Sequence, residues 1–142
     1  MTLSKIVTAS GFVLAVGLAG CSSGHDSGMQ HHMANANYMS SGTYMHDSEV
    51  GQVMTTPEGR TVYTFDKDTA GTSNCYGGCA EEWMPVTAAS DAQPFGKMSI
   101  VERSDGTRQW AYDGKPLYLY DDDSMPGDAE GDGSGGVWHV VK

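Results

Sequence analysis

The chain has 142 residues and carries 18 acidic side chains against 8 lysines and arginines, so its formal net charge is −10. A chain this acidic is not expected to bind nucleic acid, because it cannot neutralise phosphates. It is also repelled by anionic lipid, so contact with a membrane needs an anchor other than charge.

Residues 1–20 predict a bacterial lipoprotein signal peptide. Lys5 precedes the mostly apolar stretch Ile6–Leu18, which is too short to span a bilayer and has the length of a signal-peptide core. The stretch ends in Leu18-Ala19-Gly20-Cys21, which resembles a lipobox. We therefore expect cleavage before Cys21 and acylation of its side chain, which would anchor the chain to a membrane of the cell envelope. Ser22, in place of an aspartate, favours the outer membrane. An ordinary secretory signal that happens to contain a cysteine is the alternative.

Residues 21–48 predict a flexible tether, because they show no apolar period of 2 or 3.6. Four of the five histidines and four of the nine methionines lie between residues 25 and 46. Thioether sulfur binds Cu(I), and imidazole binds Cu(I), Cu(II) and zinc. The composition favours capture of copper, or a similar soft metal such as silver, by a flexible set of ligands. The alternative is a polar spacer. The candidate ligands are His25, Met29, His31, His32, Met33, Met39, Met45 and His46.

Residues 49–142 predict a single small all-β domain of about six strands with long loops. Its length is enough for one hydrophobic core and not for two. The Asp113-Gly114 dipeptide is a strong hairpin signal. A helical turn is expected over Cys79–Glu82, where Pro85 would stop it. The expected strands, in chain order, are Val50–Thr55, Thr61–Asp66, Met98–Arg103, Arg108–Tyr112, Pro116–Tyr120 and Val137–Val141.

The domain repeats itself with a period of about 55 residues. Shifted by that period, Glu58–Thr69 falls on Asp113–Ser124, and the register continues without a gap until Trp83 meets Trp138. We interpret this as an internal duplication that gives a pseudo-two-fold domain. The two tryptophans should then occupy equivalent, largely buried places.

Each repeat carries a Tyr-x-(Phe/Trp/Tyr)-x-x-Asp motif, and the pair resembles the signature of a bacterial family of secreted-repeat lipoproteins. The stretches CYGGCAEEWMPV, RQWAYDGKPLYLY and GDGSGGVWHVV are similar to other recurrent parts of that family. The resemblance covers Val50–Lys142 and implies an exported tandem-repeat domain, but no established activity. The His/Met-rich tether is not part of the signature. The motif residues are Tyr63, Phe65, Asp68, Tyr118, Tyr120 and Asp123, joined by Trp83 and Trp138.

Two roles are open for these motif residues. In a strand, residues two apart point to the same face, so the aromatic rings can fill a core while Asp68 and Asp123 cap the loops that follow. The alternative is a shared aromatic and acidic cleft on the pseudo-dyad.

Cys75 and Cys79 are expected to form a disulfide, because Cys21 is taken by lipid and an export compartment is oxidising. One alternative is a reduced metal site, since the Cys-x-x-x-Cys spacing resembles that of thioredoxin-like copper chaperones, although only the spacing matches. Thiol redox chemistry or metal transfer is a further alternative. Redox chemistry is disfavoured because no basic residue stands nearby in the sequence to lower a thiol pKa.

The loop Asp121–Gly136 is acidic and glycine-rich. Its Asp128-x-Glu130-x-Asp132-Gly133 resembles the first half of an EF-hand loop, but the twelfth position would be His139, so a solvated loop is the first expectation. His139 is expected to be an ordinary strand residue.

No catalytic arrangement has an interpretable spacing, so we do not expect an enzyme and name no catalytic residue. We expect an envelope binding protein with copper as its only candidate cofactor. The competing class is a structural module that contacts another envelope protein.

Overall fold

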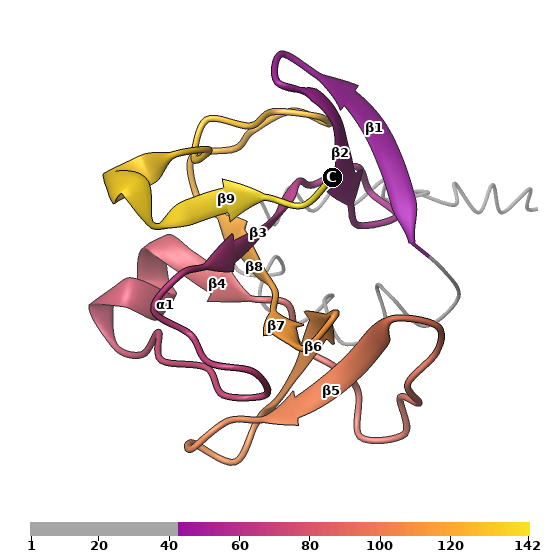
Figure 1. The fold of residues 1–142 in the computed structure, drawn as a ribbon, viewed down its shortest axis with the longest axis vertical. Helices are drawn as coiled ribbons and strands as arrows, with labels where there is room; N and C mark the ends of the chain where they lie inside the picture. Colours follow the sequence, from indigo (N-terminus) through magenta and orange to yellow (C-terminus); the bar gives the residue numbers. More distant parts are fainter. Residues whose placement is uncertain (1–42) are drawn as a thin grey trace, which may run out of the picture.

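The computed structural model describes residues 43–142 (Figure 1). The expected all-β fold with one short helical turn is confirmed, although the described residues form nine short strands rather than about six. In chain order the elements are β1 (Tyr44–Ser48), β2 (Gly51–Thr55), β3 (Val62–Phe65), α1 (Gly78–Glu82), β4 (Trp83–Pro85), β5 (Met98–Glu102), β6 (Arg108–Tyr112), β7 (Lys115–Pro116), β8 (Tyr118–Tyr120), the 3-10 turn η2 (Ser134–Gly136) and β9 (Trp138–Val140).

Cys21 and the signal peptide lie outside the described residues. So do most of the expected metal ligands, namely His25, Met29, His31, His32, Met33 and Met39. No helix within residues 43–142 is long and apolar enough to cross a membrane.

The centre of the fold is a four-stranded antiparallel sheet with the order β4-β8-β3-β9. Tyr63 in β3 stands directly opposite Tyr118 in β8. The shift that superposes the two repeats exchanges β3 with β8 and β4 with β9, so the sheet has a pseudo-two-fold axis between the two tyrosines. The expected duplication is therefore visible in the strand pairing.

Two smaller sheets flank the centre, at opposite ends of the molecule (Figure 1). One is the β1–β2 hairpin of the first repeat, and the other is β5-β6-β7 of the second. Met54 in β2 donates its backbone N–H to the carbonyl of Val141, and Trp110 in β6 donates to that of Val86. In the gap-free register of the repeats, Met54 would instead fall on Gln109. The gap-free register is therefore wrong in β2. The chain from Met54 to Tyr63 is one residue longer than the equivalent chain from Trp110 to Tyr118.

The folded domain begins before residue 49, so the expected boundary of the tether at residue 48 is wrong. Residues 44–48 form β1, which pairs with β2 along its whole length, from Tyr44 opposite Thr55 to Ser48 opposite Gly51. Met45 and His46 thus belong to a strand. The side chains of residues 44–47 are exposed, so this strand has no apolar alternation that a sequence pattern could reveal.

The expected run Pro116–Tyr120 divides between two sheets. Lys115–Pro116 pairs with β6, whereas Tyr118–Tyr120 leaves that hairpin and enters the central sheet. The helical turn ends at Glu82, and Trp83–Pro85 continues as β4 rather than as helix.

Both faces of the central sheet are buried. Adjacent residues of a strand point to opposite sides, and in β3 and β8 they enter two different core clusters. Val62, Leu117 and Leu119 belong to a mainly aliphatic cluster that also contains Trp110. Tyr63 and Tyr118 belong to a second, aromatic cluster with Trp83 and Trp138. The motif residues of the two repeats meet in this aromatic cluster.

Candidate functional site

Four aromatic rings from the two repeats form one continuous stack. Trp83 and Trp138 lie face to face, with ring centroids 3.9 Å apart and an interplanar angle of 3°. Phe65 stacks on the outer side of Trp138 at 4.2 Å, and Tyr120 stacks on the outer side of Trp83 at 4.3 Å. The indoles are 3% and 5% exposed, so the expectation that they occupy equivalent, buried places is confirmed.

The motif tyrosines and aspartates bind each other crosswise between the repeats. The hydroxyl of Tyr63 donates to Oδ2 of Asp123 at 2.6 Å, and the hydroxyl of Tyr118 donates to Oδ2 of Asp68 at 2.6 Å. The second oxygen of each carboxylate caps its own loop. Oδ1 of Asp68 accepts the backbone N–H of Asn74, and Oδ1 of Asp123 accepts that of Glu130.

Burial controls the protonation of these four groups. It raises the pKa of both phenols, and the hydrogen-bonded carboxylate raises it further, so both tyrosines stay neutral donors. Burial also raises the pKa of Asp68 and of Asp123, whereas the tyrosine hydrogen bond works in the opposite direction.

Tyr63 and Tyr118 are fully buried, so they cannot line an open cleft. The alternative of an aromatic and acidic cleft on the dyad is therefore wrong. The motif joins the two repeats and caps their loops.

Cys75 and Cys79 are joined by a disulfide, as expected, with 5.3 Å between their Cα atoms. Cys75 lies in the loop before α1 and is fully buried, whereas Cys79 lies in α1 and is partly exposed. The disulfide thus joins a partly exposed residue to a fully buried one.

A buried arginine lies against this disulfide, which sequence spacing could not show. Nη2 of Arg103 donates to the carbonyl oxygen of Cys75 at 2.7 Å, although the two residues are far apart in the chain. Nη1 donates to Oγ of Ser73 and to Oε1 of Gln109. The ring of Tyr76 covers the guanidinium, with 4.3 Å between Cζ of Arg103 and the ring centroid. A basic residue therefore does lie near the cysteines in the fold, although none does in the sequence.

The acidic loop uses its carboxylates to hold its own backbone. Oδ2 of Asp128 accepts the N–H groups of Ser124 and Met125, and these bonds lower the pKa of the Asp128 carboxyl. Oδ1 of Asp132 accepts the N–H of Val140. Residues 43–142 contain no group of three or more histidine, cysteine or acidic side chains placed to hold a metal ion. His139 is exposed, with Nε2 2.8 Å from Oδ2 of Asp66.

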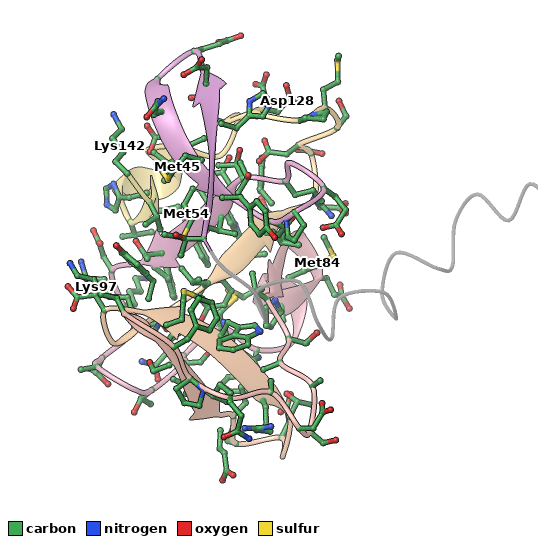
Figure 2. The ribbon with its side chains drawn as sticks, turned by 90° about the vertical axis from the view of Figure 1, so that its right-hand side faces the viewer. Met45, Met54, Met84, Lys97, Asp128 and Lys142 are labelled. Atoms are coloured by element: carbon green, nitrogen blue, oxygen red, sulfur yellow. A yellow bond between two sulfur atoms is a disulfide. The ribbon has the colours of Figure 1, made fainter. Side chains whose placement is uncertain are left out.

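His46 and two exposed methionines lie in the part of the fold where the tether enters. Met45 stands opposite Met54 on the β1–β2 hairpin, and Figure 2 shows their side chains close together. The His46 ring packs against Gly127 so closely that a Cβ on this glycine would lie 2.5 Å from Nδ1. Met125 stands two residues before Gly127 and is 68% exposed. The sequence alone gave no reason to include Met125 among the candidate ligands.

A family model described as a secreted repeat of unknown function matches the chain twice, over residues 45–87 and 99–142. Together the two matches cover more than half of the chain. The chain belongs to this secreted-repeat family. The expected resemblance is thereby confirmed, and membership of the secreted-repeat family gives the chain an extracellular or envelope location. The first match begins inside β1, which agrees with the early start of the domain. No curated protein and no solved structure matches the chain.

Proposed function

We propose that this protein is a lipid-anchored envelope protein that captures copper, with Cu(I) as its first ligand. The metal would be bound by the His/Met-rich segment together with residues at the start of the folded domain. The anchor would be the acylated Cys21, in the outer membrane. The protein would act by binding and not as an enzyme.

The observation that carries the proposal is the state of the His46 imidazole. Nδ1 lies 2.8 Å from the carbonyl oxygen of Asp47. A carbonyl only accepts, so Nδ1 must carry the hydrogen, and in the neutral ring Nε2 then keeps a free lone pair. Metal-binding histidines commonly have one nitrogen fixed by such a bond while the other faces the metal.

Thioethers lie on the same part of the surface. Met125 reaches it from the loop whose Gly127 contacts His46 and is 68% exposed. Met45, which is 47% exposed, precedes His46 in β1 and points to the opposite face of the strand. Figure 2 shows Asp128, which fixes the turn at Met125, at the hairpin end of the molecule. A mixed set of thioether and imidazole ligands favours Cu(I) over zinc, because thioethers are weak ligands for zinc.

The buried motif also supports a binding role outside the repeat core. Tyr63, Tyr118 and their aspartates are occupied with each other. A ligand-binding role is therefore better assigned to the His/Met-rich segment, most of which precedes the family match.

The test is a Cu(I) titration of the mature chain against a competing chelator, with ascorbate as the reductant. Replacing four methionines by leucine keeps length and apolarity and removes only sulfur; the four are Met29, Met33, Met39 and Met45. We expect this variant to lose at least about tenfold in Cu(I) affinity, equivalent to about 1.4 kcal/mol. Unchanged affinity would assign the segment to a spacer.

Two single variants test the contribution of the folded domain. His46→Asn and Met125→Leu should each weaken Cu(I) binding, whereas His139→Asn should not, because His139 is paired with Asp66 elsewhere on the surface. Equal affinities for all three would place the whole metal site in the preceding segment.

The anchor has its own test. Cys21→Ala should release the protein from membranes or leave it unprocessed. Mass spectrometry that found an unmodified, soluble mature chain would contradict the lipoprotein assignment.

A further inference from the structure

We propose that the Cys75–Cys79 disulfide is a thiol–disulfide exchange site, positioned by Arg103, that accepts electrons from a dithiol of another envelope protein. This inference is independent of copper binding. It rests on what the second repeat lacks, on the unequal exposure of the two sulfurs and on the buried guanidinium.

The fold does not need this disulfide to close its loop. When the two repeats are aligned on Tyr63 and Tyr118, Glu130 stands in place of Cys75 and Ser134 in place of Cys79. In the second repeat, the backbone N–H groups of Glu130 and Val140 hold the equivalent loop by donating to the carboxylates of Asp123 and Asp132. A bridge across three intervening residues also restricts the unfolded chain only weakly. Stabilisation of the fold is therefore not a sufficient reason for the Cys75–Cys79 disulfide.

The two cysteines differ in exposure. Cys79 is partly exposed on α1 and packs against the aromatic cluster that contains Trp83, whereas Cys75 is a fully buried member of that cluster. An external thiolate is therefore expected to attack Cys79 rather than Cys75. This order makes Cys75 the leaving group.

Arg103 places a positive charge on the backbone of the residue that leaves, through its bond to the carbonyl oxygen of Cys75. Its side chain is 2% exposed, and its nearest carboxylate is the half-exposed Asp105, 3.7 Å from Nε. Its other partners are neutral oxygens of Cys75, Ser73 and Gln109. Asp105 and Asp68 both interact electrostatically with this cation, but it donates its short hydrogen bonds to neutral oxygens. A buried cation favours an anion that forms on the residue it contacts, and a thiolate with a low pKa leaves faster.

The residue of the first repeat that is equivalent to Arg103 also indicates that Arg103 serves the disulfide and not the fold as a whole. Ser48 in β1 stands where Arg103 stands after β5, and it has no cysteine pair to serve. The arginine and the disulfide therefore lie together at one place in the fold, and the symmetry-related place has neither.

The exchange takes place in two steps. A thiolate of the dithiol attacks Sγ of Cys79, the Cys75–Cys79 bond breaks, and Sγ of Cys75 leaves with the electron pair. The carbonyl of Trp83, 3.9 Å from this sulfur, can accept a hydrogen bond once the sulfur is protonated. The second thiol of the dithiol gives up its proton, which the Cys75 thiolate takes, and attacks the dithiol's own sulfur in the mixed disulfide. This frees Cys79 as a thiolate. Two electrons pass to the protein, and the dithiol becomes a disulfide.

The first test compares single-cysteine variants of the folded mature chain, all carrying Cys21→Ser so that no third thiol is present. Cys75→Ser leaves Cys79 free, and Cys79→Ser leaves Cys75 free. Reaction with a chromogenic aromatic disulfide should be at least about a hundredfold faster for the free Cys79. Equal rates, or reaction of both only after unfolding, would overturn the proposed order of attack.

The second test is the redox equilibrium of the disulfide with dithiothreitol in the same Cys21→Ser background. Arg103→Met should shift this equilibrium toward the disulfide by about tenfold, whereas Arg103→Lys should shift it less because the charge is kept. Circular dichroism checks that each variant is folded. If Arg103→Met does not fold, Arg103→Lys compared with the parent still reports on the guanidinium, and the cysteine variants stand alone.

An equilibrium that is unchanged within about twofold in a folded Arg103→Met variant would show that the arginine has no part in the exchange. Resistance of the folded parent to dithiothreitol would overturn the whole proposal. Neither result would bear on the copper titration, since ascorbate leaves the disulfide closed.

Discussion

Trp83 and Trp138 stack face to face on the pseudo-dyad, each contributed by a different repeat, with 3.9 Å between their ring centroids. Because the two indoles are in direct face-to-face contact, the two side chains should be energetically coupled. Phe65 on Trp138 and Tyr120 on Trp83 extend the aromatic contact between the repeats.

Replacing either tryptophan by leucine should lower the free energy of unfolding by about 2–4 kcal/mol. The double variant should lose less than the sum, by about 0.5–3 kcal/mol, since the first change already removes the shared contact. Urea unfolding followed by circular dichroism measures all three. Trp110→Leu is the control: Trp110 lies in the aliphatic cluster, so its effect should add to that of Trp138→Leu. Strict additivity of the stacked pair would contradict the coupling.

The buried phenols predict alkaline unfolding. In the folded protein the pKa of Tyr63 and of Tyr118 is raised above the usual 10.0. The folded state therefore keeps both protons at a pH where the unfolded state releases them. Stability should be unaffected by these groups below about pH 10 and should fall above it, by up to about 1.4 kcal/mol per group and pH unit.

Tyr63→Phe and Tyr118→Phe should each make this fall less steep, measured as the urea midpoint against pH. Each should also cost about 1–3 kcal/mol at neutral pH, because a buried carboxylate loses its donor. Tyr112→Phe serves as the control in β6. The same steep fall in both phenylalanine variants would show that other groups cause it.

Gly131 should not tolerate a methyl group. A Cβ at this position would lie 2.5 Å from Cη2 of Trp83 and 3.0 Å from Cδ1 of Tyr120. Gly131→Ala should therefore cost about 1–3 kcal/mol in unfolding free energy by overpacking the ring stack. Gly78→Ala is a matched control, since a Cβ at Gly78 would meet nothing within 4 Å and neither glycine has a positive φ. Equal urea midpoints for the two variants would contradict the close packing.

Removal of β1 should destabilise the domain. A chain that begins at Glu49 lacks the strand that covers β2 through five register pairs. Since each cross-strand pair contributes a few tenths to 1 kcal/mol, we expect a loss of about 1–3 kcal/mol relative to a chain that begins at Thr43. Identical urea midpoints for the two chains would show that the stable domain begins at residue 49.

Much of the architecture could be predicted from local sequence, because it depends on local signals. The Asp113-Gly114 turn was recognised from its residue types, and both residues have the positive φ that such a turn requires. The periodic match of tyrosines and tryptophans likewise predicted the pseudo-symmetry.

Features that depend on long-range contacts were not predicted. The strand β1 is exposed along most of its length, so pairing and not apolar pattern defines it. The segment Pro116–Tyr120 crosses from one sheet to another. The sequence does not indicate this, because all five of its residues are apolar or aromatic. Arg103 reaches Cys75 only through the fold. Sequence spacing therefore identified the disulfide correctly and described its electrostatic surroundings wrongly.

The crosswise Tyr–Asp bonds have a consequence for the autonomy of each half. In a single repeat, Tyr63 would have no Asp123 to accept its hydrogen, and Asp68 would have no Tyr118 to donate to it. One half alone would expose an indole face and leave a phenol and a carboxylate without partners, whereas two copies of that half could satisfy each other. The chain is thus organised like a covalently fused homodimer, in which the aromatic core takes the place of an interface between subunits. Later specialisation, such as the cysteine pair, could then arise in one half without disturbing the symmetric contacts that hold both together.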